Sequence, residues 1–105
     1  MSFMIHSANL NLTAEEEQYA QEKAEKLLHF SKQAETDASV KVKFEIDKYN
    51  GKDKTHQFMC TITVDIPGKV IHAESYGSGV YAVIDEAVKK AEIQVKKEKE
   101  KHLHI

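Results

Sequence analysis

Apolar and polar residues alternate in four separate stretches of the chain, with the period of two that is typical of β-strands covered on one face. The second and third stretches are separated by a segment that contains Asn50-Gly51, a strong turn-forming pair, so we predict a β-hairpin there. Pro67-Gly68 makes a second tight turn before the last strand. The predicted strands are residues 3–6, 40–47, 57–66 and 70–75.

Two other stretches carry apolar residues at intervals of three and four, which predicts amphipathic helices. The first helix follows Thr13, which forms a capping box with Glu16, and runs to about Phe30. The second follows a glycine-rich entry in which Ser78 is the expected N-cap, and its apolar face extends to Val95. The order is therefore β-α-β-β-β-α. We predict an α+β fold in which two helices pack on one face of a mainly antiparallel four-stranded sheet.

The length of 105 residues predicts one domain over residues 1–105, too small for a large enclosed active site. Cys60 is the only cysteine, so no internal disulfide can form, and its place in an alternating strand predicts a buried thiol. No apolar run is long enough to span a membrane, and the first residues do not read as a secretory signal. We expect a cytoplasmic protein with no membrane partner.

The charge balance argues against simple electrostatic capture of nucleic acid. The chain has 17 acidic residues against 15 basic ones, a net charge of −2. The acid is concentrated early, because residues 1–38 hold seven acids and three lysines whereas residues 80–105 hold five and six. Every basic residue is a lysine, so the bidentate grip of arginine is absent. Any contact with nucleic acid should therefore be made to the phosphate backbone and be sensitive to salt.

Lysines recur along the second predicted helix, where two interpretations stay open. Lys90, Lys97 and Lys101 line up along one flank with Gln94 beside them, and Lys89 and Lys96 lie opposite the apolar face. Such strips can follow a nucleic-acid backbone. Acid-before-lysine pairs at i, i+4 are also the ordinary decoration of a solvated helix. The pairs in question are Asp85 with Lys89, Glu86 with Lys90, and Glu92 with Lys96.

The sequence contains no enzyme signature. No nucleophile elbow or glycine-rich phosphate loop occurs, and the histidines lack the spacing of a metal site, so we predict no cofactor, no metal and no small-molecule substrate. His6 and His72 fall on predicted strands and, with Lys41 and Lys43, would share the exposed sheet face. His72 is a weak candidate for extending a phosphate-binding surface.

With these elements assigned, the chain resembles the family of ribosome hibernation promoting factors and ribosome-associated inhibitors, also called sigma-54 modulation proteins. The likeness covers essentially the whole chain and is strongest in Ile71-His72-Ala73 and in Tyr81-Ala82-x-Ile84-Asp85, which opens a helix with spaced lysines. Leu12-Thr13 and Tyr19 support it upstream. The resemblance implies a fold like that of double-stranded RNA-binding domains. Because the chain ends near Ile105, it is similar to the short family members.

The resemblance also implies a function and a set of contacts. Such proteins bind the small ribosomal subunit in the channel for messenger and transfer RNA and silence idle ribosomes under stress or in stationary phase. A short member would need a second hibernation factor to pair ribosomes. The residues that we expect to contact ribosomal RNA are Lys23, Lys26, Lys89, Lys90, Gln94, Lys96, Lys97, Lys99 and Lys101.

A protein-interaction regulator that does not bind RNA directly is the alternative. The acidic isoelectric point of about 6.3 and the absence of arginine favour it. Ile93 lies nearly opposite the apolar face of the second helix, at a position that is often basic in the family. An exposed apolar side chain there would mark a protein contact.

Overall fold

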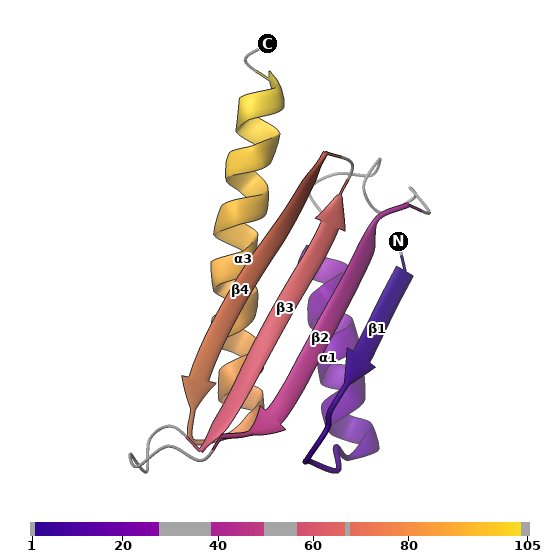
Figure 1. Ribbon diagram of the computed structural model, residues 1–105, viewed down its shortest axis with the longest axis vertical. Helices are drawn as coiled ribbons and strands as arrows, with labels where there is room; N and C mark the ends of the chain where they lie inside the picture. The colour runs from indigo at the N-terminus through magenta and orange to yellow at the C-terminus, as the bar shows by residue number, and fades with distance from the viewer. Residues whose placement is uncertain (1, 28–38, 50–56, 67, 104–105) are drawn as a thin grey trace.

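A computed structural model describes residues 2–27, 39–49, 57–66 and 68–103 of the chain, with side chains described as far as Lys97. Four strands and two helices follow one another in the predicted order β-α-β-β-β-α (Figure 1). The elements are β1 (Ser2–His6), α1 (Ala14–Leu27), β2 (Lys41–Lys48), β3 (Phe58–Ile66), β4 (Lys69–Gly77) and α3 (Val80–Leu103).

The strands form one mixed sheet in the order β1-β2-β3-β4. β1 runs parallel to β2, and α1 makes the crossover between them, whereas β2, β3 and β4 pair antiparallel. The register places Phe44 opposite Ile62, and Ile62 opposite Ala73, so the apolar positions of neighbouring strands share one face. The predicted α+β fold is confirmed.

Both helices lie on the same face of the sheet, and no described helix covers the other face (Figure 1). α3 packs along β3 and β4 and also contacts α1. The core consists of the apolar strand positions and the inner faces of the two helices, and its largest side chain is Phe44. Cys60 is completely buried, as predicted, and burial raises the pKa of its thiol to about 12, which keeps it protonated and unreactive.

The two helix starts differ in their capping. At α1 the predicted capping box is confirmed: the Thr13 amide donates to Glu16 Oε1 at 2.9 Å, and the Glu16 amide donates to Thr13 Oγ1 at 3.1 Å. At α3 the prediction of Ser78 as N-cap is wrong. The Val83 amide donates to the Gly79 carbonyl, so Gly79 occupies the N-cap position.

Some predicted features fall outside the described residues or differ slightly in extent. The hairpin turn at Asn50-Gly51, Pro67 and the predicted end of the first helix at Phe30 lie outside the described ranges. Gly68 in the second turn has a φ of 84°, a backbone conformation that glycine adopts without strain. β4 is longer than predicted and includes Gly77, where a Cβ atom would lie 3.1 Å from Val83 Cγ1.

Candidate nucleic-acid interface

The side of α3 that points away from the core carries several of the predicted basic residues. Val83, Ile84, Ala87 and Ala91 are fully buried, so they fix which side of the helix meets the core. The opposite side must then face solvent, since α3 has 3.6 residues per turn. Beyond the core-covering part, α3 continues past the end of the sheet (Figure 1). Lys99 and Lys101 lie on this last part of the helix, where side chains are outside the described set.

Three lysines form the exposed basic surface of α3. Lys89, Lys96 and Lys97 are exposed, and within the described part of the chain none of their ammonium groups has a hydrogen-bond or ion-pair partner. A lysine without an intramolecular partner gives up only water and counterions when it meets a phosphate. We call Lys89, Lys96 and Lys97 the lysine surface.

Two of the three expected acid–lysine pairs along α3 are not formed. Lys90 Nζ lies 4.0 Å from Glu86 Oε1, at the limit of an ion pair. Glu92 makes no ion pair with Lys96, and the Asp85 carboxylate turns to α1 instead of to Lys89. The solvated-helix interpretation therefore accounts for Lys90 but not for the lysine surface.

Lys90 and Gln94 lie on the flank of α3 that meets the edge of the sheet. Lys90 Nζ donates to the Glu74 carbonyl at 2.9 Å, and Gln94 Nε2 donates to the His72 carbonyl at 3.0 Å. Both acceptors belong to β4, whose outer edge has no neighbour among the described strands. The two side chains thus satisfy backbone groups that would otherwise be exposed. Half of the Lys90 side chain, 51%, stays exposed and can still meet an anion.

The two predicted lysines of α1 differ in their surroundings. Lys26 is exposed, and the described residues offer it no ion-pair partner. Lys23 is half-buried, with its Nζ 3.7 Å from Asp85 Oδ1 and 5.4 Å from the centre of the Tyr19 ring. Lys26 therefore leaves its charge open to solvent, whereas Lys23 helps to hold α1 against α3.

A contact that sequence spacing did not predict joins the two helices. The Tyr19 hydroxyl donates a hydrogen bond to Asp85, and the Tyr19 ring packs edge-on against Tyr81 with 4.8 Å between centroids. The hydrogen bond to the carboxylate, together with partial burial, raises the pKa of Tyr19 to about 12. Asp85 thus helps to hold α1 against α3. No local pattern links residues 66 positions apart in the sequence.

The open sheet face carries mixed charges. His72 lies in one row with Lys43 and Thr63, as the register shows. Its Nε2 is 3.1 Å from Glu74 Oε1, and this hydrogen bond, with one from Tyr76, lowers the pKa of Glu74. Lys43 is likewise 3.5 Å from Glu45 Oε1. His6 is on a neighbouring row, opposite Glu45. These basic groups face acids, so the open face is a poorer phosphate surface than α3.

Ile93 is 56% exposed among the lysines of α3, as predicted.

In the described part of the chain, no group of three or more histidine, cysteine or acidic side chains could hold a metal ion. The described helices include none that is long and apolar enough to cross a membrane.

The fold and the lysine surface define a small α+β protein in which one of the two helices presents exposed lysines. The chain belongs to the family described as sigma 54 modulation protein / S30EA ribosomal protein, whose model matches residues 3–103. This membership confirms the resemblance noted in the sequence.

Solved structures of related proteins share the fold. The N-terminal domain of Protein Y from Thermus thermophilus is 28% identical, with a TM-score of 0.70 over 92% of this chain and 98% of that one. A ribosomal subunit interface protein from Coxiella burnetii is 17% identical, with a TM-score of 0.71 over 94% of this chain and 98% of that one. A search of curated protein sequences gives no significant match.

Proposed function

We propose that this protein binds the small ribosomal subunit in the channel for messenger and transfer RNA and silences idle ribosomes. Membership of the S30EA family and the similarity to a ribosomal subunit interface protein support a ribosomal partner. The observation that carries the proposal is the lysine surface of α3, where three exposed ammonium groups lack partners in the described part of the chain. The protein acts in the cytoplasm and needs no catalytic step.

The contacts are made to phosphates of ribosomal RNA. Lys89 and Lys96 lie on the outer side of α3, and Lys97 lies on the flank that also carries Lys90. Together they can contact successive phosphates of a backbone. Lys26 extends this surface onto α1, and Lys99 and Lys101 extend it along the part of α3 that projects beyond the sheet (Figure 1). Lys90 contributes its exposed charge while remaining bonded to β4. Without arginine, affinity depends on the number of lysines engaged.

Occupation of the channel blocks translation sterically. While the protein occupies the channel, messenger RNA and transfer RNA cannot occupy the same space. The buried face of α3 packs into the core and so holds the lysine-bearing helix in a fixed position. Pairing of two ribosomes would require a second factor.

Sedimentation with ribosomal subunits tests the proposal. The wild-type protein should travel with the small subunit and be displaced by messenger RNA with initiator transfer RNA. A Lys89→Gln, Lys96→Gln, Lys97→Gln variant should remain at the top of the gradient. A matched control removes the same charge elsewhere, through Lys41→Gln, Lys48→Gln and Lys69→Gln on exposed strand positions.

The control variant should sediment with the small subunit like the wild type. Equal loss in both triple variants would show that only net charge matters, and no loss in either would place the contact elsewhere. Co-sedimentation with the large subunit alone would contradict the proposed site.

A further inference from the structure

A groove runs between α1 and β1, on the opposite side of α1 from α3. Its volume is about 510 Å³, and its apolar floor is formed by Phe3 and Ile5 of β1. The wall on the helix side consists of Glu17, Gln21 and Glu25. Phe3 and Ile5 are half-buried, and the Phe3 ring is held edge-on against Phe44 with 5.5 Å between centroids. The groove therefore has a fixed apolar base beneath an acidic wall.

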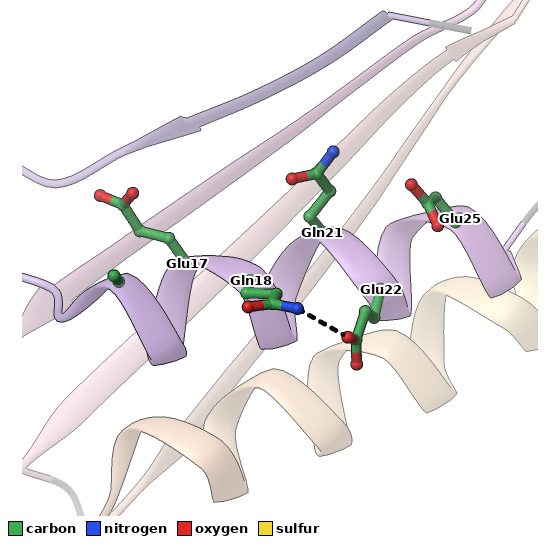
Figure 2. Close-up of a pocket in the computed structure, with 6 residues that line it drawn as sticks. Glu17, Gln18, Gln21, Glu22 and Glu25 are labelled. Atoms are coloured by element: carbon green, nitrogen blue, oxygen red, sulfur yellow. Dashed lines mark hydrogen bonds between the residues drawn. The ribbon is translucent and has the colours of Figure 1, made fainter.

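The three wall residues form a ladder along α1. They are four positions apart, so they lie on the same flank of the helix. Figure 2 shows Glu17, Gln21 and Glu25 projecting on the side of α1 that faces β1, whereas Glu22 lies nearer α3. All three are exposed and, within the described ranges, have no hydrogen-bond or ion-pair partner. Two carboxylates and one amide are thus available to a ligand.

The backbone beside these three residues is a strand edge with no partner among the described strands. Ser2 donates its amide to the Val40 carbonyl at 2.9 Å, which fixes the hydrogen-bond phase of β1 against β2. Because bonding alternates along a strand, Phe3 and Ile5 direct their amide and carbonyl groups away from β2. Of the strands that the structure describes, β1 is the last one on this side of the sheet. The opposite edge is different, since Lys90 and Gln94 cover carbonyls of β4.

We propose that the groove binds an extended, lysine- or arginine-containing segment of a partner protein, which pairs with β1 as an additional strand. The free groups of Phe3 and Ile5 supply the main-chain hydrogen bonds. Alternate side chains of the added strand face the helix layer, where long aliphatic stems cover the apolar floor and their charged ends reach Glu17 and Glu25.

The charge of the groove selects protein over nucleic acid. Carboxylates at Glu17 and Glu25 repel phosphate, so the groove and the lysine surface address different partners. The inference is independent of the proposed function, because neither wall glutamate contacts a lysine of α3 in the described structure.

Titration with a defined peptide tests the proposal. The probe is a seven-residue peptide in which lysine and threonine alternate, and its control has the same composition with the lysines in one block. On adding the alternating peptide, the Phe3 and Ile5 amides should shift in nuclear magnetic resonance spectra and exchange with solvent more slowly. The block peptide should bind about fivefold more weakly, since it cannot place its charges on one face.

A pair of matched variants tests whether Glu17 and Glu25 contribute to peptide binding. Glu17→Gln with Glu25→Gln should weaken the alternating peptide about fivefold or more. Glu15→Gln with Glu22→Gln removes the same charge, including one first-turn glutamate, from outside the groove and should bind like the wild type. Spectra of the free variants check that each remains folded.

Several outcomes would overturn the proposal. These are no binding of the alternating peptide, equal binding of the block peptide, equal weakening in both double variants, or binding that leaves exchange at Phe3 and Ile5 unchanged. Because the ladder variants keep every lysine, their sedimentation with ribosomal subunits reports the proposed function separately.

Discussion

The two helices lie on the same face of one sheet yet present opposite charges to solvent. α1 carries five glutamates and two lysines, one of which is held against Asp85. α3 carries six lysines and five acids, one of which is Asp85. Lys23 of α1 and Asp85 of α3 pair with each other at the contact between the helices. The remaining charges make the solvent-facing side of α1 more acidic and that of α3 more basic. A protein with a net charge of −2 can in this way offer a basic surface and an acidic groove at once.

The helices also differ in how they are anchored. α1 buries Ala20, Ala24 and Leu27, two of which are small, so it gains much of its position from the contact with α3. α3 buries a longer row of branched side chains, including Val83 and Ile84. The basic surface thus rests on the more deeply packed element.

The largest expected effect comes from breaking the anchor of α3. Ile84→Ala should lower the free energy of unfolding by about 2–5 kcal/mol, because it leaves a cavity at a fully buried position. Denaturant unfolding measures this loss.

The charge-neutralising triple variant at Lys89, Lys96 and Lys97 should change stability by less than about 0.5 kcal/mol per site, since these side chains are solvated. Unfolding of the triple variant would show that the lysine surface is structural.

Weakening the contact between the two helices should cause the next largest loss of stability. Tyr19→Phe keeps the ring contact with Tyr81 but removes the hydrogen bond to the Asp85 carboxylate. Hydrogen bonds to charged groups contribute about 1.5–3 kcal/mol, and partial exposure places the expected loss near the lower end. Thermal and denaturant unfolding give the value, with Tyr49→Phe at the exposed position just after β2 as the matched control. A larger loss in the control would contradict the role of Tyr19.

The same contact predicts a dependence on alkaline pH. The pKa of Tyr19 is about 12 in the folded chain against an ordinary 10.0, so folding favours the protonated hydroxyl. Its contribution to stability is complete below pH 10 and is lost as the pH rises through about 12. Asp85→Asn should bring the Tyr19 phenol titration back toward 10, as followed by phenolate absorbance. An unchanged titration in that variant would contradict the assigned cause.

The smallest effect is expected at the edge of β4. Gln94→Leu removes the hydrogen bond to the His72 carbonyl and should cost about 0.5–1.5 kcal/mol. Hydrogen exchange at residues 71–75 reports whether the edge opens. Glu92→Gln, at the same helix level but away from β4, is the control. Faster exchange in the control than in Gln94→Leu would rule out this role for Gln94.

Local patterns in the sequence predicted the elements but not the contacts between them. Alternation placed Phe44 and Ile62 on one strand face, and the Thr13–Glu16 capping box located the start of α1, because both depend on neighbouring residues. The Ser78 cap failed because serine beside glycine does not show which residue begins the helix.

The spacing of residues along the sequence does not predict contacts between elements that are far apart in the chain. Asp85 and Lys89 have the spacing of an ion pair, yet packing of α1 directs Asp85 to Tyr19. Lys90 and Gln94 looked like surface residues until the edge of β4 supplied their acceptors. The groove beside β1 exists because β1 is an edge strand of the described sheet. The alternation of apolar and polar residues predicts a strand but not its place in the sheet.

The salt dependence of binding to the isolated small subunit tests the central claim most directly. The logarithm of the association constant should fall linearly with the logarithm of salt concentration, by about 0.7–0.9 for each phosphate that is neutralised. Neutralising Lys89, Lys96 and Lys97 should make that slope shallower by about 2–3, whereas neutralising Glu17 and Glu25 should leave it unchanged. An affinity that does not depend on salt, or a slope that is the same in the lysine variant, would contradict binding through the lysine surface.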